Sequence, residues 1–78
     1  MTASVAEYMP VLRVALDLPL HRLFDYVAES ATPADVGLRV RVPFGRGERL
    51  GVIVEVAADS DWPVDQLKPV KEILRDLP

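Results

Sequence analysis

The chain has 78 residues, with no cysteine, one histidine and a formal net charge of −3. Its length limits it to one small domain, the lack of cysteine excludes disulfides, and the net charge argues against a general basic coat for nucleic acid. It has no apolar run near the roughly 20 residues that cross a bilayer and no signal-peptide order at its start, so a cytoplasmic protein is expected.

The first part of the chain contains two short segments with the alternation of a strand. Residues 1–10 have no useful periodicity and end at a proline, so a flexible leader is expected there. Apolar residues alternate along 12–18 and again along 23–28, which predicts two strands, the first ended by a proline. The domain proper is therefore expected to span residues 11–78.

The middle of the chain predicts a hairpin. A cluster of turn-forming residues at 32–37 leads into a strand at 38–44. A glycine-bearing loop at 45–48 connects it to a return strand at 50–56. Gly51 lies on the opposite face from the leucine and valines of that strand, where another part of the chain could approach closely.

The last part of the chain predicts a loop at 59–63, one helical turn at 64–67 and a short strand at 70–74. Short strands at regular spacing, with glycine and proline at the corners and almost no helix, are typical of small barrels. The predicted fold class is therefore all-β, a small OB-like barrel with one short helical turn.

Charge is divided unevenly along the predicted hairpin. Residues 38–51 carry a net charge of +3, whereas residues 55–65 carry −4. A polyanion would therefore meet the arginine end, where guanidinium groups stand beside a bare glycine corner. The alternative is an ordinary solvated face. The candidate phosphate contacts are Arg39, Arg41, Arg46 and Arg49.

An acidic residue, Asp25, stands between the aromatic residues Phe24 and Tyr26 inside a predicted strand, where its type is disfavoured. One interpretation is that it faces solvent and pairs with an arginine. The other is that its carboxylate accepts a hydrogen bond from a sugar hydroxyl beside an aromatic platform. Phe24 and Phe44 also match the apolar period of their strands, so both are candidates for the core as well as for a platform.

The sequence offers no general acid–base pair, no nucleophile beside a base and no phosphate-cradling loop. Gly45 and Gly47 lie too close together, with no following helix, to form a dinucleotide-binding loop. A single histidine gives no metal cluster. The sequence therefore predicts neither an enzyme, nor a cofactor, nor a metal site in this chain.

Several separated motifs, taken in order, resemble the N-terminal part of the primosomal protein N′ (PriA) family of replication-restart helicases. The resemblance covers about residues 11–77. Its motifs are Val-Ala-Leu at 14–16, Leu-Phe-Asp-Tyr at 23–26, Gly-Leu-Arg-Val-Arg-Val-Pro-Phe-Gly-Arg at 37–46, Arg-Leu-Gly-Val-Ile-Val at 49–54 and Leu-Lys-Pro-Val at 67–70.

This resemblance implies a DNA-binding domain that captures the 3′ end of the nascent leading strand at a stalled fork. The family continues into a winged-helix domain and an ATP-dependent 3′-to-5′ helicase motor, whose motifs do not occur in these residues. The implied partners are DNA, the remaining helicase domains of the same chain and primosome proteins. A cytoplasmic, nucleoid-associated location follows from the same resemblance.

The resemblance also implies which residues bind the 3′-terminal nucleotide: Phe24, Asp25, Gly45 and Lys68. Phe24 and the stem of Lys68 would flank the base, Gly45 would let the backbone approach it, and Asp25 would accept a hydrogen bond from the 3′-hydroxyl. A base held by its faces rather than by its edges carries little sequence preference.

Two rival functions remain at this point. The acidic end, residues 55–65, could dock a protein partner, which would make this a protein-interaction barrel. The barrel could also bind single strands or RNA in general. Titration with nucleic acid separates the first rival from the DNA-end hypothesis, and comparison of DNA with RNA and of free with closed ends separates the second.

Overall fold

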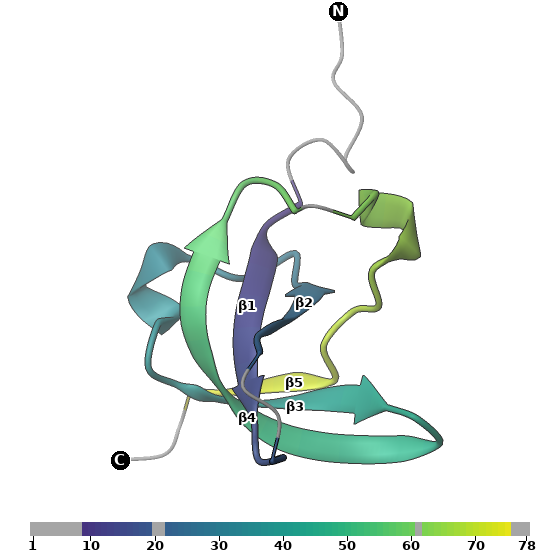
Figure 1. Cartoon of the computed structure of the whole chain (residues 1–78). Coiled ribbons are helices and arrows are strands. Elements are labelled where there is room, and N and C mark those ends of the chain that lie inside the picture. The colour runs from purple at the N-terminus through teal and green to yellow at the C-terminus, as the bar shows by residue number, and fades with distance from the viewer. Residues whose placement is uncertain (1–8, 20–21, 61, 76–78) are drawn as a thin grey trace, which may run out of the picture.

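The computed structural model describes residues 9–19, 22–60 and 62–75. The predicted leader lies mostly outside the described residues. Within them the chain forms five strands and two 3-10 turns (Figure 1). They are β1 (Val11–Leu16), β2 (Phe24–Val27), η2 (Pro33–Asp35), β3 (Arg39–Phe44), β4 (Gly47–Ala57), η3 (Val64–Gln66) and β5 (Glu72–Leu74).

The strands form one sheet in the order β2-β1-β4-β3-β5, and neighbouring strands are antiparallel. The two ends of this sheet meet through the segment before β5. The Val27 amide donates to the Lys68 carbonyl at 3.0 Å, and the Val70 amide donates to the Val27 carbonyl at 3.0 Å. One residue later, the Lys71 amide donates to the Arg41 carbonyl of β3 at 2.7 Å. These bonds curl the sheet into the small all-β, OB-like barrel that the sequence predicted.

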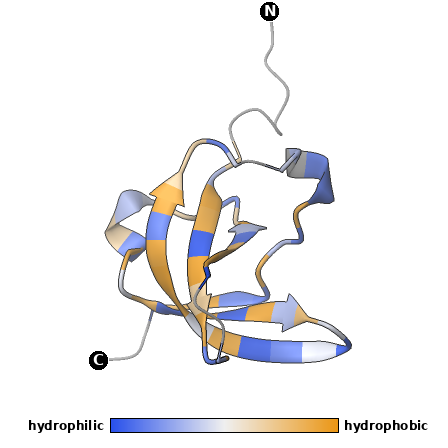
Figure 2. Cartoon of the chain, in the orientation of Figure 1, coloured by the Kyte–Doolittle hydropathy of each residue, from blue (hydrophilic) through white to orange (hydrophobic). Residues whose placement is uncertain are grey.

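The core lies inside this barrel and comes mainly from β1, β3 and β4. Figure 2 shows that β1 is apolar along most of its length, with one polar residue within it, and that the second half of β4 is also mainly apolar. Leu12, Val14, Val40, Val42 and Ile53 are completely buried. The predicted strands and the helical turn at η3 are thus present, and a second 3-10 turn, η2, lies within the predicted turn cluster. In the described part of the chain, no helix is long and apolar enough to cross a membrane.

The long strand β4 turns its most regular apolar face outward. Leu50, Val52 and Val54 are between 42% and 47% exposed, whereas Ile53 is completely buried and Gly51 is buried beside it. The inward face is set by contact with β1, where Leu16 lies opposite Gly51 and Val14 opposite Ile53. The alternation of apolar residues therefore predicts correctly that this segment is a strand, but it does not predict which face of the strand is buried.

Gly51 allows β4 to approach β1 closely. A Cβ atom built on Gly51 would lie 2.5 Å from Cγ1 of Val14 and 2.7 Å from the carbonyl oxygen of Ala15. Because the carbonyl belongs to the backbone, the strands would have to separate to accept a methyl group. The close approach inferred from the sequence at Gly51 is confirmed.

We expect Gly51→Ala to lower the free energy of unfolding by about 1–3 kcal/mol, the usual cost of overpacking a well-packed site. Urea denaturation followed by circular dichroism measures this change. Gly47→Ala is the matched control on the same strand, because nothing lies within 4 Å of a Cβ at Gly47. Equal stability of the two variants would contradict the close approach.

The end of β5 is tied to η2 by a bidentate ion pair. Arg75 Nη2 lies 2.7 Å from Asp35 Oδ2, and Arg75 Nε donates to Asp35 Oδ1 at 3.2 Å. The Thr32 amide also donates to Asp35 Oδ2 at 3.0 Å. These hydrogen bonds hold the pKa of the Asp35 carboxyl below its ordinary value, and those from Arg75 have the largest effect. The pair holds the end of β5 beside η2, on the side of the barrel away from the β3–β4 turn (Figure 1).

Candidate nucleic-acid interface

A hollow of about 240 Å³ opens where the start of β2, the end of β3 and the segment after η3 converge. It contains all four residues that the resemblance implied, Phe24, Asp25, Gly45 and Lys68. The other residues that line it are Arg22, Tyr26, Pro43, Phe44, Trp62 and Gln66. Residues that are 44 positions apart in the sequence thus share one small site.

A second, larger hollow of about 590 Å³ runs along the seam between β2 and β5. Met9, Val27 and Ile73 are among the residues that line it. Its volume is greater, but it holds none of the four implied residues, and the described residues that line it include no aromatic side chain. The smaller hollow is therefore the better candidate site, because it combines aromatic, acidic and basic groups.

The floor of the smaller hollow is aromatic. The rings of Phe24 and Phe44 meet edge to face, with centroids 5.5 Å apart and planes at 86°. The guanidinium carbon of Arg22 lies 4.5 Å from the centre of the Phe24 ring, within the range of a cation–π contact. Phe24 is half-buried and packs against the core, which confirms its predicted place there, and it also lines the hollow. Its role as a platform for a base stays a prediction.

A hydrogen bond from Tyr26 holds the two walls of the hollow together. The Tyr26 hydroxyl donates to the Pro43 carbonyl at 2.9 Å, joining β2 to the end of β3. Burial raises the pKa of this hydroxyl above its ordinary value, so it stays protonated and remains a donor. The bond fixes Phe24 and Phe44, which lie close to its two partners, in their relative positions.

Asp25 does not pair with an arginine among the described residues. Arg13 lies directly opposite it on β1, but Arg13 Nε pairs with Glu55 Oε1 at 3.3 Å. The hydroxyl of Ser60 donates instead to Asp25 Oδ2, and Oδ1 has no hydrogen bond to the described residues. One carboxylate oxygen is therefore held in place by Ser60, and Asp25 itself lines the hollow.

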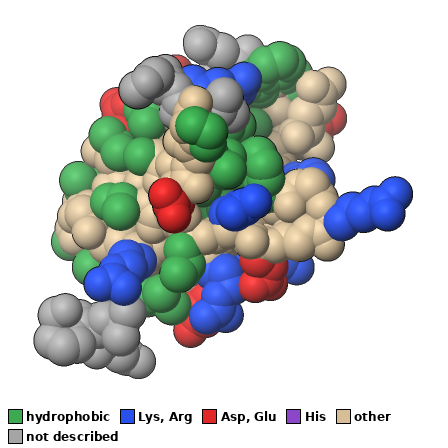
Figure 3. Space-filling model, turned by 60° about the horizontal axis from the view of Figure 1, so that its bottom comes forward, with side chains coloured by type: hydrophobic (Ala, Val, Ile, Leu, Met, Phe, Trp, Pro, Cys, Tyr) green, Lys and Arg blue, Asp and Glu red, His purple; other side chains and the backbone are tan. Residues whose placement is uncertain are grey.

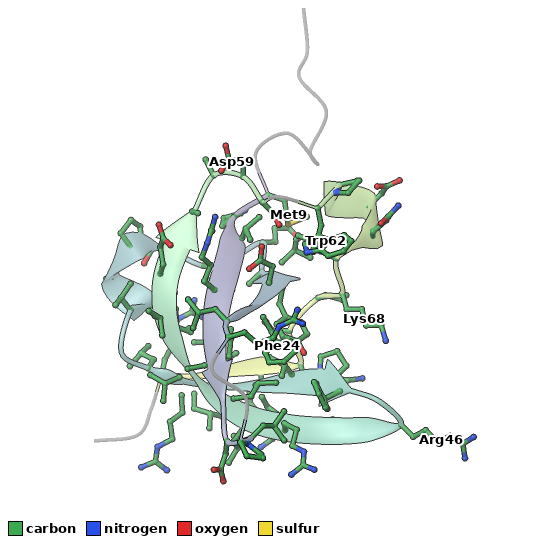
Figure 4. The ribbon with its side chains drawn as sticks, in the orientation of Figure 1. Met9, Phe24, Arg46, Asp59, Trp62 and Lys68 are labelled. Atoms are coloured by element: carbon green, nitrogen blue, oxygen red, sulfur yellow. The ribbon has the colours of Figure 1, made fainter. Side chains whose placement is uncertain are left out.

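Gly45 and Lys68, which come from different segments, both line the hollow. Phe44 pairs with Gly47, which leaves Gly45 and Arg46 as a two-residue turn, and Gly45 has a φ of +59° that side chains disfavour. The Lys68 carbonyl is bound to β2, while its side chain is exposed at the rim (Figure 4). An incoming group could thus meet bare backbone on one side and an ammonium group on the other.

The four arginines proposed as phosphate contacts lie outside this hollow. Arg41 pairs with Glu72 at 3.1 Å and with Glu48 at 3.8 Å. Arg39 lines a separate shallow hollow beside Leu50 and Val52. Arg46 stands at the tip of the β3–β4 turn and points away from the site (Figure 4), and Arg49 is exposed on β4. Their contact with phosphate stays a prediction.

The sequence analysis did not single out Arg22, Pro43, Trp62 or Gln66, which also line the hollow. Arg22 stands just before β2 and could have been suspected from its place two residues before Phe24. Trp62 belongs to the predicted loop at 59–63, lines this hollow and is 57% exposed. Gln66 has no sequence signal that would have singled it out.

Among the described residues, no group of three or more acidic, histidine or cysteine side chains could hold a metal ion.

Comparison with known proteins shows the family of this chain. The sequence profile of a family described as the 3′ DNA-binding domain (3′BD) of PriA matches residues 13–78. The replication restart protein PriA of Haemophilus influenzae is 41% identical over 66 residues, which cover 85% of this chain and 9% of that protein. The chain thus spans about a tenth of the length of this relative. On both grounds, the chain belongs to the PriA 3′ DNA-binding domain family.

Proposed function

We propose that this domain binds the 3′-hydroxyl end of a DNA strand in the hollow formed by β2, β3 and the segment after η3. The observation that carries the proposal is the convergence of Phe24, Asp25, Gly45 and Lys68 on a single hollow. The family to which the chain belongs supplies DNA as the ligand class. In a longer parent protein, the domain would present such ends to a helicase motor during replication restart and primosome assembly.

The terminal nucleotide meets a different group on each side. Its base lies against the Phe24 platform, with the methylene stem of Lys68 on the other face. Arg22 already covers part of Phe24, and its flat guanidinium group is itself a stacking surface for a base. The free oxygen of Asp25 accepts the hydrogen bond of the 3′-hydroxyl, and Gly45 leaves the backbone bare where the nucleotide enters.

The charges of the barrel favour a discrete site over a broad polyanion surface. Figure 3 shows basic and acidic side chains interspersed with hydrophobic ones over the face that it displays. Arg13 and Arg41 are each engaged with a glutamate. The basic groups on this face are thus mixed with acidic ones rather than gathered into one stripe. Binding by base faces and a terminal hydroxyl carries little preference for sequence.

The direct test compares a linear single-stranded oligonucleotide with the same sequence closed into a circle. Because the circle has no terminal nucleotide to enter the hollow, we expect it to bind at least about tenfold more weakly, the effect of losing one stacked base and its hydroxyl. Fluorescence anisotropy with the isolated chain measures both affinities.

The same titration, extended to the matching RNA, separates the rival functions. Equal binding of linear and circular DNA would favour a general single-strand binder, and tighter binding of the matching RNA would favour an RNA-binding barrel. Absence of binding to every oligonucleotide would leave the protein-interaction barrel, with its acidic segment at 55–65, as the better explanation.

A further inference from the structure

We propose that Trp62 is a second aromatic platform, which stacks the base of the penultimate nucleotide next to the 3′-terminal one. This inference rests on the proposed function, because it takes the terminal nucleotide to be in the hollow. It extends the site from one nucleotide to two and assigns a role to an exposed residue.

The first observation is the exposure of Trp62. Its exposed fraction of 57% exceeds that of every other large hydrophobic side chain that is exposed among the described residues. A tryptophan usually contributes to a protein by burying its large ring, so one left open to solvent at the wall of a hollow has a surface available for a ligand. Leu50, at 47%, is similarly exposed but lies on the outer face of β4.

The second observation is that Trp62 is attached to the group proposed to bind the terminal hydroxyl. The Trp62 amide donates to Ser60 Oγ at 3.1 Å, and the Ser60 hydroxyl donates to Asp25 Oδ2. Two hydrogen bonds thus connect the backbone of Trp62 to the carboxylate of Asp25. Trp62 is therefore held beside the carboxylate proposed to bind the 3′-hydroxyl, at the hollow that both residues line.

The third observation is the arrangement around the hollow. Figure 4 shows Trp62 on the same side of the barrel as Phe24 and Lys68, while Asp59, on the preceding loop, points away. Arg22 and Lys68 line the hollow together with both aromatic residues, so two cationic groups are near the phosphate that joins the two nucleotides. Aromatic side chains that stack successive bases beside cationic groups are the usual platform for single strands.

The test uses three oligonucleotides with a free 3′-hydroxyl: an intact one, one with an abasic site at the penultimate position and one with an abasic site at the terminal position. We expect the penultimate abasic site to weaken binding to the unaltered domain about tenfold, as for the loss of one stacked base. The Trp62→Ala substitution should weaken binding of the intact oligonucleotide by the same factor. The Trp62→Ala variant should then bind the penultimate abasic oligonucleotide as tightly as it binds the intact one.

Two variants control this experiment. Trp62→Phe keeps a flat ring and should retain most of the affinity, whereas Leu50→Ala removes an equally exposed apolar side chain elsewhere and should leave affinity unchanged. Trp62 is also the single tryptophan of the chain, so its fluorescence reports on it alone. The intact oligonucleotide should quench this fluorescence more strongly, at saturation, than the penultimate abasic one.

The inference would be overturned if the penultimate abasic site weakened binding to the Trp62→Ala variant as much as it weakens binding to the unaltered domain. Equal quenching of the Trp62 fluorescence by the intact and the penultimate abasic oligonucleotide would also overturn it. Failure of the proposed function has a different signature. In that case the terminal abasic site would leave the affinity of the unaltered domain unchanged, whatever the result at Trp62.

Discussion

Replacing the 3′-hydroxyl of an oligonucleotide by a 3′-phosphate should weaken its binding to this domain at least tenfold, which is about 1.4 kcal/mol. The phosphate adds about −1.5 to −2 charges beside the carboxylate of Asp25. One pair of like charges 4 Å apart costs about 4 kcal/mol at an effective dielectric constant of 20. Solvent and rearrangement of the open hollow reduce this cost, so tenfold is the lower bound that we expect.

The charge of Asp25 can be removed while an acceptor oxygen is kept. Asp25→Asn should weaken binding of the hydroxyl end and narrow the difference between the two ends, and Asp25→Ala should lose discrimination more fully. Asp59→Asn is the matched control, because it removes one negative charge from the neighbouring loop without changing the hollow. Equilibrium titrations by fluorescence anisotropy give each affinity. Equal binding of hydroxyl and phosphate ends by the unaltered domain would refute the role of Asp25.

The strands could be predicted from the sequence because each follows the period of two that a half-buried strand imposes. Which face of β4 is buried could not be predicted in the same way. Leu50, Val52 and Val54 form the more regular apolar series, but the side that packs on β1 is decided by Gly51, which has no side chain to hold the strands apart. The closure of the barrel depends on backbone bonds at Val27 and Lys71, which leave no mark in the sequence.

The four residues implied for the site were found through their resemblance to a family, and the fold brings them into one hollow. Periodicity alone could not decide whether Phe24 is a core residue or a platform for a base. The half-buried ring explains this, because one side of it packs against the core. The bond from Ser60 to Asp25 joins residues that are 35 positions apart, and Trp62 reaches the hollow only because of this loop. Contacts of this kind depend on tertiary structure and have no local sequence signal.

Removal of the Phe24 ring should have the second large effect on binding. Stacking of one base is worth about 1–3 kcal/mol by alanine substitution, so Phe24→Ala should weaken binding of a 3′-hydroxyl end by roughly that amount. The same substitution should also lower the free energy of unfolding, because the half-buried ring contacts both the core and the edge of Phe44. Binding and folding therefore have to be separated by a second variant.

Phe24→Leu makes this separation, because leucine restores apolar volume to the core but offers no flat face to a base. We expect it to keep most of the stability, measured by thermal denaturation, and still to bind a 3′-hydroxyl end several-fold more weakly. Phe44→Leu is the matched control, since it alters the neighbouring ring and leaves Phe24 and Arg22 in contact. If Phe24→Leu is folded and binds as tightly as the unaltered domain, Phe24 contributes only to the core. The guanidinium group of Arg22 lies over the same ring. If Phe24→Leu weakens binding and Phe44→Leu does not, the stacking surface is the pair of Phe24 and Arg22 rather than both phenylalanine rings.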